Sequence, residues 1–276
     1  MRVAAIQMNS GSEVEANLDT AGRLIEAAAA DGARLVALPE NFALMPVRSR
    51  DKSSHAESPG RGPIQAFLAE TARRHGVWII GGTIPLESPE AGRVYGACPV
   101  VDDKGEIRAT YLKIHLFDID VPGSGESYRE SNSMYPGDEH MVCDTPAGRV
   151  GLTVCYDVRF PELYRRLVDD GATLFTVPAA FTLATGKAHW HTLLKARAIE
   201  NLCYVIAPGQ SGTHPDQRST YGHSLIIDPW GRVLAELEDG EGFVVADVDR
   251  DAQEKLRREA PMLDNRRFEL TTRIKH

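Results

Sequence analysis

The sequence lacks the marks of a membrane-spanning, disulfide-rich or nucleic-acid-binding protein. No run approaches the ~18 apolar residues of a membrane span, and the apolar start at Met1 to Ile6 is too short for a secretory signal. The four cysteines, Cys98, Cys143, Cys155 and Cys203, are widely spaced, which favours neither a disulfide framework nor a zinc ribbon. A net charge of −8 opposes nonspecific nucleic-acid binding. We therefore expect a cytoplasmic protein with no nucleic-acid or membrane partner.

What the sequence contains is an ordinary globular composition with one conspicuous stretch at residues 149–163. The chain has 276 residues, 42% of them hydrophobic and 25% charged, enough to bury a large core. An apolar, β-prone run there turns into a helical pattern, so that Cys155 falls at a strand-to-helix corner. Unpaired N–H groups at a helix start favour thiolate over thiol, which makes Cys155 a candidate nucleophile. The alternative is a buried structural cysteine.

The rest of the chain alternates strand and helix patterns, which predicts an α/β fold. Helical patterns cover residues 13–30, 63–75, 187–200 and 250–259. Strand patterns cover 2–8, 34–38, 77–83, 94–101, 107–112, 173–177, 203–207, 222–227, 232–237 and 243–248, while 45–62, 114–140 and 209–221 read as loops. Glu40 and Lys113 each lie at the end of an apolar strand, where α/β proteins place ligand-binding groups.

The two halves of the sequence resemble each other. Four segments of the first half, 3–6, 31–39, 77–82 and 101–107, correspond in the same order to 150–153, 170–178, 203–209 and 227–233 of the second. The repeat predicts two similar helix-covered sheets, packed face to face as a four-layer αββα sandwich of two pseudo-symmetric halves in a single domain spanning 1–276. The alternative is the ordinary repetition of helix-Gly-strand phrases in any α/β protein.

The strand-end residues supply the groups that a thiol needs to attack an amide. Glu40 can alternate as base and acid if the pocket raises its pKa, and Lys113 with the backbone N–H of Tyr156 can face the oxyanion. Taken singly, a Glu or a Lys is more often a solvated surface charge. Their common position after strands is what favours a catalytic interpretation.

Three motifs in this order resemble the nitrilase, or carbon–nitrogen hydrolase, superfamily: Leu38-Pro39-Glu40-Asn41, the run from Tyr111 to Asp118, and the run from Gly151 to Glu162. The resemblance implies Glu40, Lys113 and Cys155 as a catalytic triad. Short motifs at 129–133, 186–190, 197–200 and 221–224 are similar to those of the Nit branch, which contains deaminated glutathione amidases and omega-amidases. The first of these motifs matches Glu130 to that family's second glutamate. The family implies an αββα sandwich, commonly a homodimer, with no cofactor or metal.

The resemblance implies a thiol amidase that cleaves the terminal amide of a small keto acid, with deaminated glutathione first, through a Cys155 thioester and with release of ammonia. Alternatives are an omega-amidase acting on α-ketoglutaramate, an N-carbamoyl amino acid hydrolase, and a catalytically idle scaffold on the same fold. Arg159 lies one helical turn beyond Cys155, so we expect it to bind the substrate carboxylate together with Thr185; the alternative is a structural Arg. His189 and His191 are two residues apart on a helix and therefore do not predict a metal site.

Overall fold

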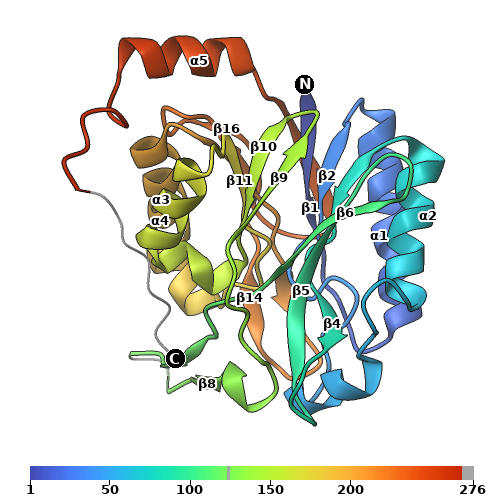
Figure 1. Cartoon of the computed structure of the whole chain (residues 1–276). Coiled ribbons are helices and arrows are strands. Elements are labelled where there is room, and N and C mark those ends of the chain that lie inside the picture. The colour runs from blue at the N-terminus through green and yellow to red at the C-terminus, as the bar shows by residue number, and fades with distance from the viewer. Residues whose placement is uncertain (123–124, 269–276) are drawn as a thin grey trace.

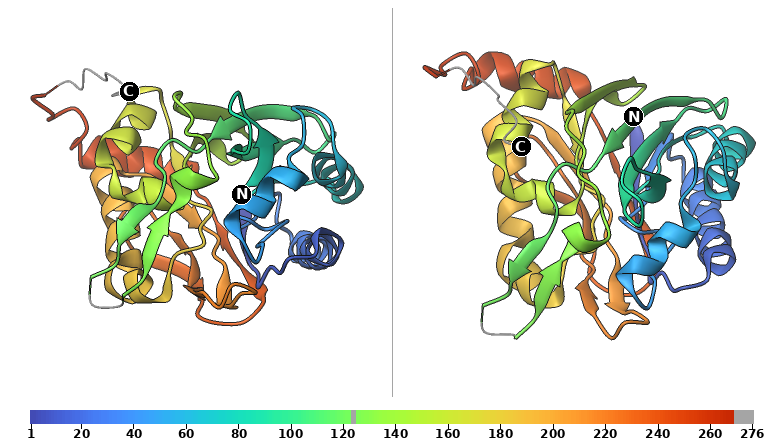
Figure 2. Two further views of the ribbon diagram at one scale, coloured as in Figure 1. Left: turned by 90° about the horizontal axis from the view of Figure 1, so that it is seen from below. Right: turned by 60° about the horizontal axis from the view of Figure 1, so that its bottom comes forward.

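Two β-sheets face each other at the centre of the molecule, and helices cover the outer face of each (Figure 1). The computed structural model describes residues 1–122 and 125–268, so the last eight residues of the expected 1–276 domain lie outside the described residues. Views from two further directions show the blue and cyan helices of the first half opposite the yellow helices of the second half (Figure 2). The predicted four-layer αββα sandwich is confirmed.

The first sheet has the strand order β17-β1-β2-β3-β5-β4, with β6 pairing to β5. Its strands are β1 (Arg2–Gln7), β2 (Leu35–Ala37), β3 (Trp78–Ile80), β4 (Ile84–Glu87), β5 (Val94–Val101), β6 (Ile107–Leu112) and β17 (Gly242–Asp247). Helices α1 (Val14–Ala30) and α2 (Pro63–His75) cover its outer face. Strands β1, β2 and β3 run parallel to one another. Strand β5 is antiparallel to β3, and β6 is antiparallel to β5.

The second sheet repeats this pattern with the order β16-β15-β12-β11-β10-β9. Its strands are β9 (Met141–Thr145), β10 (Gly148–Leu152), β11 (Leu174–Thr176), β12 (Tyr204–Ala207), β15 (Ser224–Ile227) and β16 (Val233–Leu237). Helices α3 (Pro161–Asp169) and α4 (Leu183–Asn201) cover it, and α5 (Arg250–Glu259) lies over one end of this half. Strands β10, β11 and β12 run parallel to one another, β15 is antiparallel to β12, and β16 is antiparallel to β15. The predicted pseudo-symmetry of the two halves is therefore confirmed.

The central strands are apolar at nearly every position because each is buried on both of its faces. In β1, Val3 and Ala5 belong to the cluster between the two sheets, whereas Ala4 and Ile6 belong to the cluster beneath α1 and α2. Alternate residues of a strand point to opposite faces, so a strand covered on both faces carries apolar residues at every position. No helix in the described part of the chain is long and apolar enough to cross a membrane.

The three expected loops contain short elements that the sequence does not reveal. Residues 114–140 form a hairpin of β7 (Asp118–Asp120) and β8 (Ser127–Arg129) and a 3₁₀ turn, η2 (Glu130–Asn132). Residues 209–221 form the hairpin of β13 (Ser211–Thr213) and β14 (Ser219–Tyr221), and residues 45–62 contain the 3₁₀ helix η1 (Ser49–His55). Three-residue strands and 3₁₀ turns are too short to generate a periodic pattern, which is why they escape prediction.

Candidate active site

The site lies at one end of the sandwich, where strands of both sheets end. Glu40 follows β2, Lys113 follows β6, and Cys155 follows β10 and opens the 3₁₀ helix η3 (Cys155–Arg159). Because the two sheets share one architecture, these strand ends meet at the same edge. The residues that the sequence placed far apart therefore face one another.

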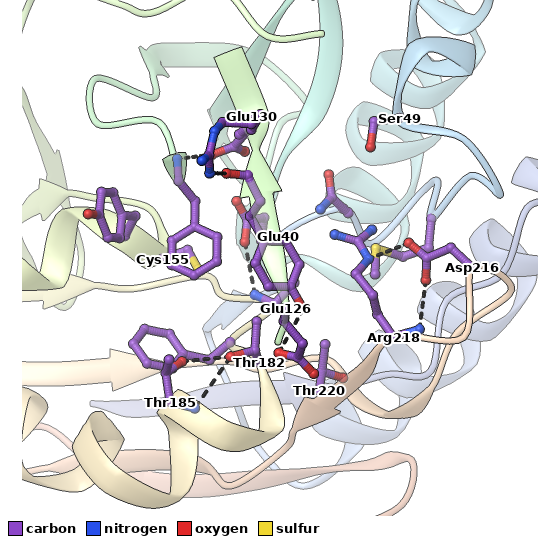
Figure 3. A pocket seen from close by; sticks show the side chains of 18 of the residues that line it. Glu40, Ser49, Glu126, Glu130, Cys155, Thr182, Thr185, Asp216, Arg218 and Thr220 are labelled. Carbon is purple, nitrogen blue, oxygen red and sulfur yellow. Dashed lines mark hydrogen bonds and ion pairs between the residues drawn. The ribbon is translucent and has the colours of Figure 1, made fainter. Parts of the chain in front are cut away.

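A cavity of about 400 Å³ opens at this edge. Its walls include Glu40, Lys113, Glu130, Cys155, Tyr156, Phe181 and Thr185, together with the β7–β8 hairpin and the turn before β14. Figure 3 shows Glu40, Glu130 and Cys155 close together at one end, with Thr182 and Thr185 below them and Asp216 and Arg218 at the opposite side. The volume lies within the range of small-molecule sites, about 300–1,000 Å³.

Lys113 lies at the centre of a buried ion-pair network. Its Nζ donates to Glu40 Oε1 at 2.7 Å and to the two Glu130 carboxylate oxygens at 2.9 Å each, and its side chain is only 2% exposed. Burial opposes the charged form, but the carboxylates of Glu130 and Glu40 outweigh it and raise the pKa of Lys113 well above its usual value. Lys113 is therefore a fixed positive charge in the cavity wall.

Glu40 is held as an ionised carboxylate. Its second oxygen, Oε2, accepts a hydrogen bond of 2.9 Å from the backbone N–H of Ala180, which follows β11 of the other half. Burial would raise the pKa of Glu40, but the Lys113 charge and hydrogen bonds from Lys113 and Cys155 together lower it. The sequence argument made the acid–base role of Glu40 conditional on a raised pKa; the pKa is lowered instead, because Lys113 lies in direct contact with the carboxylate.

Cys155 adopts a strained backbone conformation at the corner, and a backbone hydrogen bond fixes it there. It has φ 48°, a left-handed conformation that non-glycine residues rarely adopt, and its N–H donates to Pro178 O at 2.9 Å. Burial and the neighbouring Glu40 charge raise the pKa of the Cys155 thiol well above its usual value, despite Lys113. The raised pKa favours the thiol over the expected thiolate, and the neighbouring Glu40 carboxylate can take its proton.

Asp157 ties the corner to the strand that carries Lys113. Its fully buried carboxylate accepts from Tyr111 Oη at 2.8 Å, from Val154 N at 2.8 Å, and from the backbone and ring nitrogens of His115. Tyr111 and His115 flank Lys113 in sequence, so a single carboxylate fixes the Cys155 corner against the Lys113 strand end. Glu130 is fixed in turn by the N–H of Phe117, which donates to its Oε2 at 2.7 Å.

The structure places Arg159 outside the lining of the cavity. Its guanidinium lies 5.8 Å from the ring centroid of Tyr156 and 5.2 Å from that of Phe181, and Nη1 lies 3.3 Å from His189 Nδ1. The expectation assumed an α-helical turn after Cys155, but η3 is a 3₁₀ helix. With about three residues per turn, the fourth residue after Cys155 no longer stacks above it. Thr185 does line the cavity, and its Oγ1 lies 2.8 Å from Thr182 Oγ1.

A cluster that could hold a metal ion lies apart from the residues that line the cavity. Ligand atoms of His191, His223 and Glu236 all lie within 4.8 Å of one another. Both histidine rings hydrogen-bond the same Glu236 oxygen, Oε1, at 2.7 and 2.6 Å. His189 is not part of this cluster; its Nδ1 lies 3.3 Å from Arg159 Nη1.

Sequence reasoning missed several residues of the cavity wall. Among them are Lys52 in η1, Phe117 and Tyr128 near the β7–β8 hairpin, and Arg218 before β14. All four lie in stretches that read as loops, so no periodicity marked them. The repeat did offer a signal for Ala180, because Pro178 corresponds to Pro39 and the residues that follow each proline occupy equivalent strand ends.

Known proteins resemble this chain in both sequence and fold. A sequence model described as carbon-nitrogen hydrolase matches residues 2–258. A deaminated glutathione amidase of Synechocystis sp. is 43% identical over 96% of this chain and 97% of its own length. The Caenorhabditis elegans NitFhit structure superposes with a TM-score of 0.90 at 38% identity, over 96% of this chain and 65% of that one. Saccharomyces cerevisiae Nit3, a member of the nitrilase superfamily, superposes with a TM-score of 0.87 at 31% identity, over 97% of both chains. This chain belongs to the carbon–nitrogen hydrolase family.

Proposed function

We propose that this protein is a thiol amidase whose nucleophile is Cys155, whose base and acid is Glu40, and whose fixed cation is Lys113. The observation that supports this proposal most is that the three groups line one cavity: Glu40 accepts a hydrogen bond from the Lys113 ammonium, and its charge acts on the Cys155 thiol. We propose Glu130 as the residue that positions Lys113, and Thr185 as a contact for the substrate. Arg159 lies against Tyr156 and Phe181 of the cavity wall, and its contact with the substrate carboxylate stays a prediction.

In the first half-reaction, the Cys155 sulfur forms a bond to the amide carbon while Glu40 takes the thiol proton. The carbonyl oxygen gains negative charge, which the Lys113 ammonium and the Tyr156 N–H stabilise. Glu40 becomes neutral in this step, so its attraction for Lys113 weakens as the oxyanion forms. The C–N bond then breaks as Glu40 returns the proton to the departing nitrogen, leaving an acyl thioester on Cys155.

In the second half-reaction, Glu40 takes a proton from water as the water oxygen attacks the thioester carbon. The C–S bond breaks, the proton passes from Glu40 to the sulfur, and the carboxylic acid leaves. Every atom and proton is accounted for by the substrate, water, Cys155 and Glu40. Lys113 stays protonated throughout, which agrees with the raised pKa that its two carboxylate neighbours give it.

The substrate that the similarity favours is deaminated glutathione. Relatives of that name align over nearly the full chain, and the cavity offers cationic side chains for an acidic substrate. The amine released depends on the amide cleaved. The expected release of ammonia holds for a primary amide such as α-ketoglutaramate. It does not hold for deaminated glutathione, whose amide nitrogen carries cysteinylglycine, so that cysteinylglycine leaves instead. We also propose a cytoplasmic homodimer, on the family resemblance and the sequence composition; analytical ultracentrifugation tests the dimer.

A substrate panel tests the activity. The purified protein is incubated with deaminated glutathione, α-ketoglutaramate and an N-carbamoyl amino acid, and the acid products are quantified by mass spectrometry. We expect the highest kcat/KM for deaminated glutathione. A higher value for either other compound reassigns the substrate within the family. Absence of turnover on the whole panel, together with alkylation of Cys155 no faster than that of Cys98, favours the scaffold alternative.

A further inference from the structure

Four cationic side chains line the cavity: Lys52, Lys113, Arg129 and Arg218. Three of them form ion pairs, Lys113 with Glu40 and Glu130, Arg129 with Asp120, and Arg218 with Asp216. Lys52 differs, because within the described residues no carboxylate oxygen lies within 4.0 Å of its Nζ. The cavity therefore presents one cation whose charge no carboxylate of the described chain contacts directly.

The position of Lys52 is fixed by the turn that carries Glu40. Its Nζ donates to Asn41 Oδ1 at 2.8 Å and lies 4.0 Å from Met134 Sδ. Asn41 directly follows Glu40, and its own N–H donates to Thr83 Oγ1 at 2.8 Å. An ammonium has three N–H donors. The amide oxygen takes one and the thioether sulfur is at most a weak acceptor, so Nζ has donor capacity left for a ligand.

The environment of Lys52 favours an anionic ligand. Burial lowers the pKa of Lys52, although the carboxylates of Glu130 and Glu40 act in the opposite direction. Burial of the Lys52 ammonium removes water from it, and this loss is offset by one neutral hydrogen bond and by the charges of Glu130 and Glu40, without a direct counter-ion in the described residues. A bound carboxylate would supply both the missing counter-ion and a charge-assisted hydrogen bond.

We propose that Lys52 forms an anion subsite that binds a carboxylate of the amide substrate. This inference rests on the proposed amidase function and assigns to Lys52 the role that the sequence suggested for Arg159. The subsite selects acidic amides over neutral amides of the same length. It acts mainly on substrate binding, since no described hydrogen bond or ion pair joins Lys52 to Cys155 or Glu40, and its charge acts on Glu40 only at longer range.

The test compares Lys52→Met and Lys52→Arg with the wild type on two amides of equal chain length, glutaramate and the neutral pentanamide. Lys104→Met, which removes an exposed lysine outside the cavity lining, serves as the matched control. A charge-assisted hydrogen bond contributes about 1.5–3 kcal/mol, so Lys52→Met should raise KM for glutaramate by about 10- to 100-fold. Its kcat/KM on pentanamide should fall much less than on glutaramate, because the neutral amide loses only the effect of the Lys52 charge on Glu40. Lys52→Arg should recover much of the lost glutaramate affinity.

A binding measurement separates failure of the subsite from failure of the amidase proposal. Isothermal titration calorimetry with glutarate, which requires no turnover, should show weaker binding to Lys52→Met than to wild type and Lys104→Met. Absence of turnover by the wild type with intact, Lys52-dependent glutarate binding would overturn the amidase proposal and leave the subsite standing. Equal losses on both amides by a folded Lys52→Met protein, or unchanged glutarate affinity, would overturn the subsite. Melting temperatures establish that the variants are folded.

Discussion

The two halves of this molecule share one strand order and one set of strand directions, yet they contribute different chemistry. The first half supplies the charged groups: Glu40 at the end of β2 and Lys113 at the end of β6. The second half supplies the thiol, Cys155 at the end of β10, and a backbone donor, Ala180, after β11. A common frame therefore places equivalent strand ends together, and the residues that follow each strand determine what each end does.

The comparison is most direct after β2 and β11. Both strands run into a proline, Pro39 and Pro178. The first half continues with the carboxylate of Glu40, whereas the second half presents the N–H of Ala180, and the two meet at 2.9 Å. The halves thus complement each other across the interface between the sheets, and neither half holds the whole site.

The largest effect should come from removing the contribution of the second half. Cys155→Ala should lower kcat on the best amide of the panel by at least about 10⁴-fold, since loss of a catalytic nucleophile in other enzymes has effects of this order. Cys98→Ala, which removes a buried thiol from the first half, should retain most of the activity. Steady-state kinetics check both variants. Comparable losses in the two would remove the distinction between the halves.

Removing the cation of the first half should affect stability as well as activity. Lys113→Met leaves the Glu40 and Glu130 carboxylates buried without their partner, which should cost about 3–5 kcal/mol in the free energy of unfolding. Lys52→Met should cost much less, because its Nζ bonds an amide oxygen instead of a carboxylate. Urea denaturation of both variants measures the difference. Equal costs would contradict the assignment of Lys113 as the structural centre of the network.

The stability of the wild type and that of Lys113→Met should depend on pH in opposite directions through Glu40. In the wild type the pKa of Glu40 is lowered, so its contribution to stability is present above its unfolded pKa and is lost as pH falls through the folded pKa. In Lys113→Met the main lowering interaction is gone, and burial then favours protonated Glu40. The melting temperature of the variant should therefore rise, relative to wild type, from neutral to mildly acidic pH. A parallel pH profile for the two proteins would contradict this.

A smaller effect should follow from disturbing the turn that carries Glu40. Gly82 has φ 55°, and a Cβ there would lie 2.1 Å from Pro39 O, so Gly82→Ala must displace the Pro39-Glu40 backbone. We expect a loss of about 1–3 kcal/mol and a reduced kcat. Gly76 has a similar φ of 61°, but a Cβ added there would meet no atom within 4 Å, so Gly76→Ala isolates the backbone strain alone. Equal kcat in the two variants would contradict the link from Gly82 to Glu40.

Much of the frame was predictable from the sequence, because long buried elements leave a periodic signal. The helices α2 and α5 and the strand β6 have the expected bounds, 63–75, 250–259 and 107–112. The repeat also predicted which strands correspond. The hairpins β7–β8 and β13–β14 were missed because each strand has three residues. Such segments form through contacts with the rest of the fold, which local sequence does not encode.

The site divides in the same way. The strand-end positions of Glu40, Lys113 and Cys155 follow from the pattern of strands, so their proximity could be predicted from the sequence. Their ionisation could not be predicted, because the pKa values depend on which charges touch: Lys113 lowers that of Glu40, and Glu40 raises that of Cys155. The surroundings of Arg159 and Lys52 depend on a 3₁₀ turn and on the absence of a carboxylate beside Lys52 in the described residues. Both features appear only in three dimensions.

The most direct measurement is mass spectrometry of the enzyme quenched in acid during turnover of its best amide substrate. We predict an adduct with the mass of the acyl group on the peptide that contains Cys155, and no adduct on the same peptide of Cys155→Ala. The first result would show that the thiol of the second half attacks the substrate under the charges of the first. An adduct that maps to another residue, or undiminished turnover by Cys155→Ala, would contradict the account.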